Sequence, residues 1–211
     1  MKIKRSIPAV ALTAMMLVII SPAFGSNYSF VASDGYLIGN PNGGDRFSYD
    51  GSLVKASPGG LAVFLDTDNN VGSVVANFKT EKGVYTRVHK KFDKIAANTY
   101  LHGNTGTGPP VLPKLWTYLA TWGMADVWLN GKFIANDWPA HLMWAESARD
   151  DFTHKVDFKG PKGLKEGYEG STDPADMEVH LVIHSPGAKP GSGFPPFEVF
   201  YHLLWERVTV K

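Results

Sequence analysis

Apolar and polar residues alternate along much of this chain, in short stretches that glycine and proline separate. Successive side chains of a β-strand point to opposite faces, so this period of two predicts strands with one buried face. The predicted strands are residues 61–66, 71–78, 84–92, 124–129, 132–135, 140–146, 177–185 and 197–210. Residues 114–122 fit either a short helix or a further strand. The stretches at 104–113 and 158–174, rich in Gly and Pro, are predicted loops.

Turn residues support the same assignment. Asn130-Gly131 lies between two β-prone stretches, and both residues tolerate the positive φ angles of a type I′ hairpin turn. Asp68-Asn69-Asn70 provides a second turn between predicted strands. The sequence therefore predicts an all-β protein, with a single antiparallel β-sandwich or jelly-roll-like domain over residues 26–211.

The first 25 residues have the three parts of a secretory signal peptide. Basic residues at positions 2, 4 and 5 precede an apolar run over residues 7–20, and Ala23-Phe24-Gly25 offers the small residues of a cleavage site. The apolar run has about 14 residues, fewer than the roughly 20 that a membrane-spanning helix requires. We therefore expect a secreted or periplasmic protein with no membrane span after signal cleavage.

Composition narrows the chemistry of this exported domain. The chain has 21 basic and 20 acidic residues, and loss of the three basic residues of the signal leaves a net charge of about −2. Such a balance gives no electrostatic reason to expect a nucleic-acid partner. The absence of cysteine excludes disulfides, thiolate catalysis and thiolate metal ligands.

Three predicted strands place histidines on the face opposite the core. Alternate positions in these strands form apolar faces, which we assign to the core: Leu142, Trp144, Val179, Leu181, Ile183, Phe197, Val199, Tyr201, Leu203 and Trp205. The opposite face carries His141, Met143, His180, His184 and His202, with Glu178, Glu198 and Glu206 nearby. If these strands are neighbours, cross-strand side chains lie roughly 5 Å apart, which is close enough for imidazoles to share an ion.

This histidine-bearing face predicts a binding protein. The most specific form of this prediction is that the ligand is a transition metal. Imidazole suits copper and zinc, and a thioether ligand from Met143 favours copper. The principal candidate ligands are His141, Met143, His180 and His202. His184 and Glu178 are secondary candidates. His180 and His184 lie roughly 13 Å apart along one strand, too far for both to bind one ion. Two other interpretations stay open. Phe200 and Leu204 on the same face fit a pocket for a small organic ligand, and the histidines also fit an ordinary solvated or packed face.

A second class of function rests on tryptophan. The six tryptophans include Trp128 in Ala125–Lys132, a stretch that resembles the hairpin of jelly-roll sugar-binding domains. This resemblance implies a carbohydrate-binding module. Exposed tryptophans would also fit a cell-surface or extracellular assembly protein with a protein partner. The sequence contains none of the GxSxG, HExxH or glycine-rich phosphate-binding motifs of enzymes. We therefore assign no catalytic residue and favour a protein that is not an enzyme.

Overall fold

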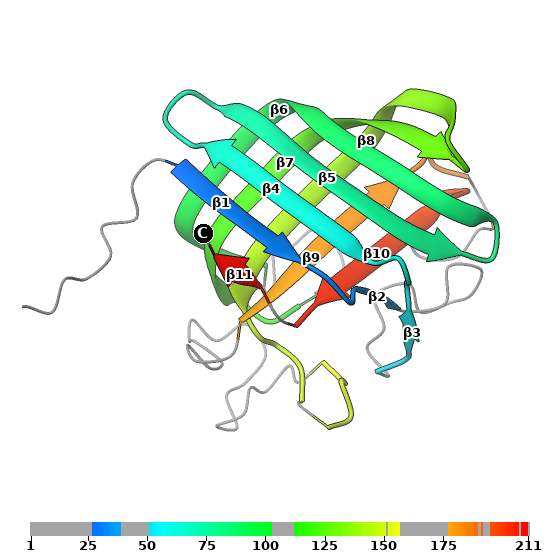
Figure 1. The fold of residues 1–211 in the computed structure, drawn as a ribbon. Helices are drawn as coiled ribbons and strands as arrows, with labels where there is room; N and C mark the ends of the chain where they lie inside the picture. Colours follow the sequence, from blue (N-terminus) through cyan, green and yellow to red (C-terminus); the bar gives the residue numbers. More distant parts are fainter. Residues whose placement is uncertain are drawn as a thin grey trace, which may run out of the picture.

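A computed structural model describes residues 27–38, 51–102, 112–150, 152–156, 177–189, 191, 195–206 and 208–210. These residues contain no helix, and their strands join in one antiparallel sheet of eleven strands (Figure 1). The strands are β1 (Asn27–Ala32), β2 (Tyr36–Ile38), β3 (Leu53–Lys55), β4 (Gly60–Asp66), β5 (Val71–Thr80), β6 (Gly83–Leu101), β7 (Leu115–Leu129), β8 (Lys132–Glu146), β9 (Met177–His184), β10 (Phe200–Trp205) and β11 (Thr209–Val210). Their order is β11-β1-β4-β5-β6-β7-β8-β9-β10-β2-β3.

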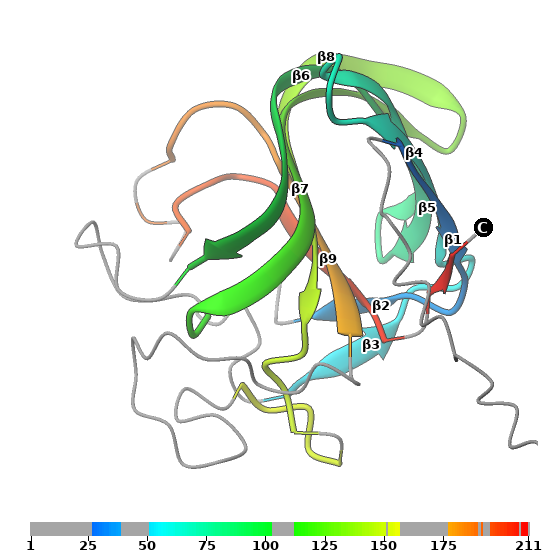
Figure 2. The ribbon, with the colours of Figure 1, turned by 90° about the vertical axis from the view of Figure 1, so that its left-hand side faces the viewer.

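The sheet curls because its long central strands bend. The pairing of β6 with β7 shifts register between His89 and Lys91 and again between Phe92 and Lys94, and such bulges bend a strand and increase its twist. Gly123 of β7 lies opposite this bend with a φ of 155°, and an added Cβ would lie 2.0 Å from the carbonyl oxygen of Lys91. Figure 2 shows the resulting curve of β6, β7 and β8.

Contacts across the concave side confirm the curl. The rings of Phe30 in β1 and Trp144 in β8 have centroids 5.3 Å apart, and those of Phe78 in β5 and Tyr201 in β10 are 5.5 Å apart. The N-terminal segment joins the two ends of the sheet, because β1 pairs with β4 whereas β2 pairs with β10. The Trp205 indole N–H also donates to the carbonyl of Gly59, just before β4, at 2.7 Å.

The main apolar core lies on the concave side. It includes the residues that the sequence assigned to the core of β8, β9 and β10: Leu142, Trp144, Val179, Leu181, Ile183, Tyr201, Leu203 and Trp205. A second, smaller cluster lies on the other face of β8, formed by Leu112, Leu115, Met143, Ala145 and Ala148. Part of the sheet is therefore buried on both faces.

The all-β prediction is confirmed, and the predicted sandwich or jelly roll is not, since hydrogen bonding joins the strands in a single sheet. Local alternation defines strands but leaves open which distant strands pair, and here curling of one sheet encloses the core. The stretch at 114–122 belongs to strand β7 from Leu115 onward, and the predicted strands at 132–135 and 140–146 are one strand, β8. The β7–β8 hairpin is confirmed, with φ angles of 51° at Asn130 and 76° at Gly131.

The predicted signal peptide, residues 1–25, lies outside the described residues. Within the described part of the chain, no helix is long and apolar enough to cross a membrane.

Candidate functional site

Strand register brings the predicted histidine face together in two rows. His141 of β8 lies opposite Val182 of β9, which lies opposite His202 of β10. In the next row Met143 lies opposite His180, which lies opposite Leu204. Side chains in such rows are close neighbours. The order β8-β9-β10 therefore places four of the predicted ligands, His141, Met143, His180 and His202, on one small area.

This face is buried rather than open to solvent. Met143 is 1% exposed, His180 2% and His202 3%. Between them lies a cavity of about 150 Å³, lined by His102, Leu112, His141, Met143, His180, Val182 and His202. A cavity of about this size holds a molecule as large as benzene. It also has room for one ion with its ligands. We call this space the histidine cavity.

A buried hydrogen-bonded chain borders the histidine cavity. The Glu178 carboxylate lies 2.6 Å from His180 Nε2, and His180 Nδ1 lies 2.9 Å from His202 Nε2. Burial acts to raise the pKa of Glu178, but the charge and hydrogen bond of His180 and the charge of Arg149 outweigh it, so this pKa is lowered. An ionised Glu178 can only accept, so His180 donates from Nε2. In the neutral form of His180 the lone pair is then at Nδ1, where it accepts from His202 Nε2.

His141 is held in one tautomer by the backbone. Its Nδ1–H donates to the Thr121 carbonyl at 2.9 Å, which leaves the lone pair on Nε2. The Trp122 ring stacks on the imidazole, with centroids 4.9 Å apart. Burial lowers the pKa of His141 to about 4, so the ring is neutral at physiological pH. A neutral imidazole with one nitrogen hydrogen-bonded to the protein is the usual form of a metal-binding histidine.

His102 completes the histidine cavity, and strand alternation did not identify it. It follows β6 with a φ of 66°, outside any strand, so no pattern of period two applies to it. Its Nε2 lies 3.1 Å from the sulfur of Met143, and its ring centroid lies 6.1 Å from that of His141. Burial, with the charges of His141 and His180, lowers the pKa of His102 to about 3. The sequence signal for His102 is its place beside the predicted loop at 104–113, which is rich in Gly and Pro.

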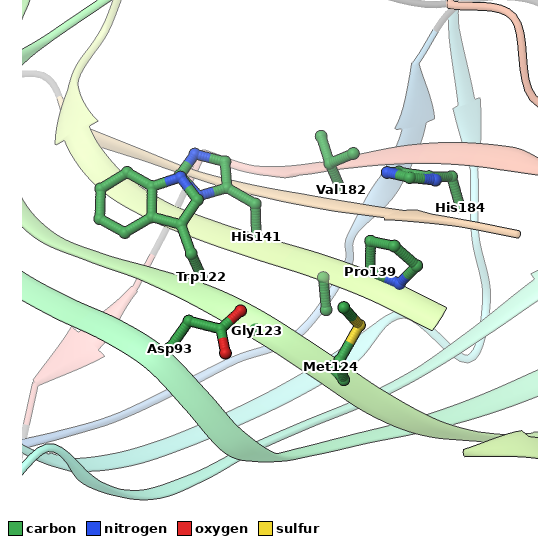
Figure 3. Close-up of a pocket in the computed structure, with 9 residues that line it drawn as sticks. Asp93, Trp122, Gly123, Met124, Pro139, His141, Val182 and His184 are labelled. Carbon is green, nitrogen blue, oxygen red and sulfur yellow. The ribbon is translucent and has the colours of Figure 1, made fainter. Parts of the chain in front are cut away.

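The two secondary candidates lie beside the histidine cavity. Glu178 orients His180 without lining the cavity. His184 lines a neighbouring cavity of about 240 Å³, together with Asp93, Trp122, Met124 and Pro139 (Figure 3). The ring of His184 stacks on Phe197 with centroids 3.7 Å apart. His141 and Val182 line both cavities and so form the wall between them.

A bound metal would require side-chain movements. Among the described residues, no three His, Asp or Glu side chains are already grouped as ligands for an ion. Tetrahedral distances of about 2.0 Å to nitrogen and 2.3 Å to sulfur place two such ligand atoms roughly 3.6 Å apart. The His102–Met143 separation of 3.1 Å would therefore widen by about half an ångström, and the flexible thioether side chain allows such a change.

The tryptophans form no exposed platform in the described part of the chain. Trp138, Trp144 and Trp205 are buried. Trp116, Trp122 and Trp128 are partly buried. Stacking on a sugar ring needs an open indole face, so the described surface does not favour the carbohydrate-binding alternative.

Comparison with known proteins gives no family for this chain, because no family model, no curated protein and no solved structure matches it.

Proposed function

We propose that this protein is an exported binding protein that takes up one transition-metal ion in the histidine cavity. In its most specific form, the proposal is that this ion is copper. The observation that carries the proposal is the convergence of four imidazoles and one thioether on a single buried space. Two imidazoles and a thioether match the ligand preference of copper, especially copper(I), whereas magnesium and calcium prefer oxygen.

The ligands proposed are His141 Nε2, His102 Nε2 and Met143 Sδ. His141 Nε2 carries the free lone pair of a ring fixed by the Thr121 carbonyl. His102 Nε2 already faces Met143 Sδ. In the metal-free protein the one ring proton of a neutral His102 lies on Nε2, facing the Met143 sulfur. A metal bound at Nε2 would move this proton to Nδ1, so copper uptake changes the tautomer of His102 without net proton release.

The hydrogen-bonded chain supports the same site from one side. His180 Nδ1 presents its lone pair to His202, and both rings line the cavity. If the His202 ring turns, His180 Nδ1 becomes a fourth ligand, the third nitrogen, and the other nitrogen of this ring is held by Glu178. Carboxylate–histidine pairs of this kind orient metal-binding imidazoles and increase their basicity.

A copper titration of the mature protein, untagged and purified without chelator, tests the proposal. We expect one equivalent of copper(I) per chain, measured by competition with a chromophoric chelator and by elemental analysis. Met143→Leu keeps the volume and removes the sulfur, so it should weaken binding at least tenfold. His184→Ala, in the neighbouring cavity, is the matched control and should bind as the wild type does.

Different outcomes would assign the cavity to another ligand. The proposal is contradicted if the protein is purified without bound metal and also fails to take up added copper or zinc. Equal affinity in the wild type and in Met143→Leu would place the copper elsewhere. In either case the histidine cavity would next be tested as a pocket for a small organic ligand, which its size and its Leu112 and Val182 walls also fit.

A further inference from the structure

Arg87 is an unusual residue for the concave side of the sheet. It lies on β6 between Tyr85 and His89, on the face that carries the main core, and its exposed fraction is 0%. Its partners in the neighbouring strands are Ala76 of β5 and Val127 of β7, and both are fully buried. A fully buried arginine is normally paired with a carboxylate.

The structure gives Arg87 one hydrogen bond and no acid. Its Nη2 donates to His89 Nδ1 at 3.0 Å. Its Nε and Nη1, which together carry three N–H groups, have no hydrogen-bond partner among the described residues. No ion pair between Arg87 and a described Asp or Glu is present either.

His89 cannot neutralise this charge. It accepts from Arg87 at Nδ1, so its proton is on Nε2, which donates to the Lys91 carbonyl at 3.1 Å. Both ring nitrogens are therefore used by a neutral imidazole. Burial and the charge of Arg87 lower the pKa of His89 to about 3, in agreement with this arrangement.

An isolated buried cation is unfavourable, and water can satisfy its N–H groups without balancing its charge. Burial lowers the pKa of Arg87 only to about 9, so the guanidinium stays charged at neutral pH. An anion at Nε and Nη1 would remove both costs, because carboxylates and other oxyanions accept charge-assisted hydrogen bonds from guanidinium.

The surroundings of Arg87 indicate what kind of anion fits. Its guanidinium lies beside His89, on the face of β6 that carries the main core. Tyr85, its neighbour on the same face, packs 5.5 Å from Phe78, 6.4 Å from Trp138 and 5.1 Å from Tyr201, measured between ring centroids. Aromatic and aliphatic walls favour an apolar ligand.

We propose that Arg87 anchors the carboxylate of an apolar organic acid on the concave side of the sheet, in a second site separate from the histidine cavity. His89 positions the guanidinium, and the surrounding aromatic side chains contact the apolar part of the ligand. The two sites lie on opposite faces of the sheet, so this proposal does not depend on metal binding.

Ligand titrations of chelator-treated protein test the second site. The probes are octanoate, octan-1-ol as its uncharged analogue, acetate and chloride, each at constant ionic strength and followed by the thermal midpoint. We expect a saturable rise in the midpoint with octanoate and none with octan-1-ol. Arg87→Met should bind octanoate at least tenfold more weakly. Lys90→Met removes an exposed cation on the same strand, one paired with Asp126, and should bind as the wild type does.

The comparison of octanoate with octan-1-ol needs only the wild type, so it remains decisive if Arg87→Met fails to fold. No saturable effect of octanoate on the wild type, or an equal effect on Arg87→Met, would overturn the proposal. Equal stabilisation by octanol would overturn the role of the charge. If chloride or acetate stabilises the protein as much as octanoate does, the apolar chain of the ligand contributes nothing. This result would contradict the proposed organic acid and leave a small-anion site at Arg87.

Discussion

Replacing His89 by glutamine should reduce the loss of stability on acidification. His89 is fully buried and its pKa in the folded protein is about 3, against 6.5 for a free histidine. Below pH 6.5 the unfolded chain therefore binds a proton that the folded protein does not. Because the folded pKa is lowered, folding stability falls as the pH decreases from about 6.5 toward 3.

The magnitude follows from the unfolded chain alone, as long as folded His89 stays neutral. Between pH 7 and pH 5 the unfolded histidine gains about 2 kcal/mol by protonation, since one pKa unit corresponds to about 1.4 kcal/mol. That is a large part of a typical stability of about 5–15 kcal/mol. Burial, and after it the charge of Arg87, keep folded His89 from taking up the proton.

Urea unfolding at pH 7 and pH 5, followed by tryptophan fluorescence, measures the effect. The wild type should lose about 2 kcal/mol more than His89→Gln over this interval, and all other histidines cancel in the comparison. Glutamine can still accept from Arg87, and circular dichroism at pH 7 checks that the variant is folded. The same pH dependence in both proteins would show that His89 is not held neutral, and would refute the reasoning.

Three further substitutions test other parts of the structure. Gly123→Ala forces a side chain onto a φ of 155° and against the Lys91 carbonyl, so we expect a loss of about 2 kcal/mol or more in urea unfolding; a loss below about 0.5 kcal/mol would contradict this geometry. Leu181→Ala leaves a void in the concave core and should cost about 2–5 kcal/mol without changing copper stoichiometry; a change in stoichiometry would show that the two faces are coupled. Glu178→Gln weakens the hydrogen bond between residue 178 and His180 Nε2 and should lower copper affinity about 10- to 100-fold. Unchanged affinity would show that Glu178 and His180 do not contribute to copper binding.

Strand alternation predicted much of the fold because side-chain direction is a local property. It assigned Val179, Leu181 and Ile183 to the core and His180 to the opposite face, as the structure has them. It left open whether this opposite face is solvated or packed, because the cover comes from residues distant in sequence, such as Leu112. Nor did it predict one curled sheet, which depends on bulges in β6 and β7.

Arg87 and His89, on the concave side, show where the pattern misleads. In the predicted strand at residues 84–92, Val84 and Val88 share one face and Arg87 and His89 share the other. Hydrophobicity alone favours the valine face as the core. The structure buries Arg87 and His89 instead and leaves both valines partly exposed. Such an inversion is typical of a site where chemistry overrides local preference, which agrees with the proposed anion site.

X-ray absorption at the copper edge tests the proposed metal site most directly, on protein loaded with one equivalent of copper(I). We expect nitrogen scatterers near 2.0 Å and one sulfur near 2.3 Å, typical of imidazole and sulfur ligands. In a chain without cysteine the sulfur must come from methionine, and it should disappear in Met143→Leu. A shell of nitrogen and oxygen alone, or a sulfur that persists in Met143→Leu, would contradict a copper site in the histidine cavity.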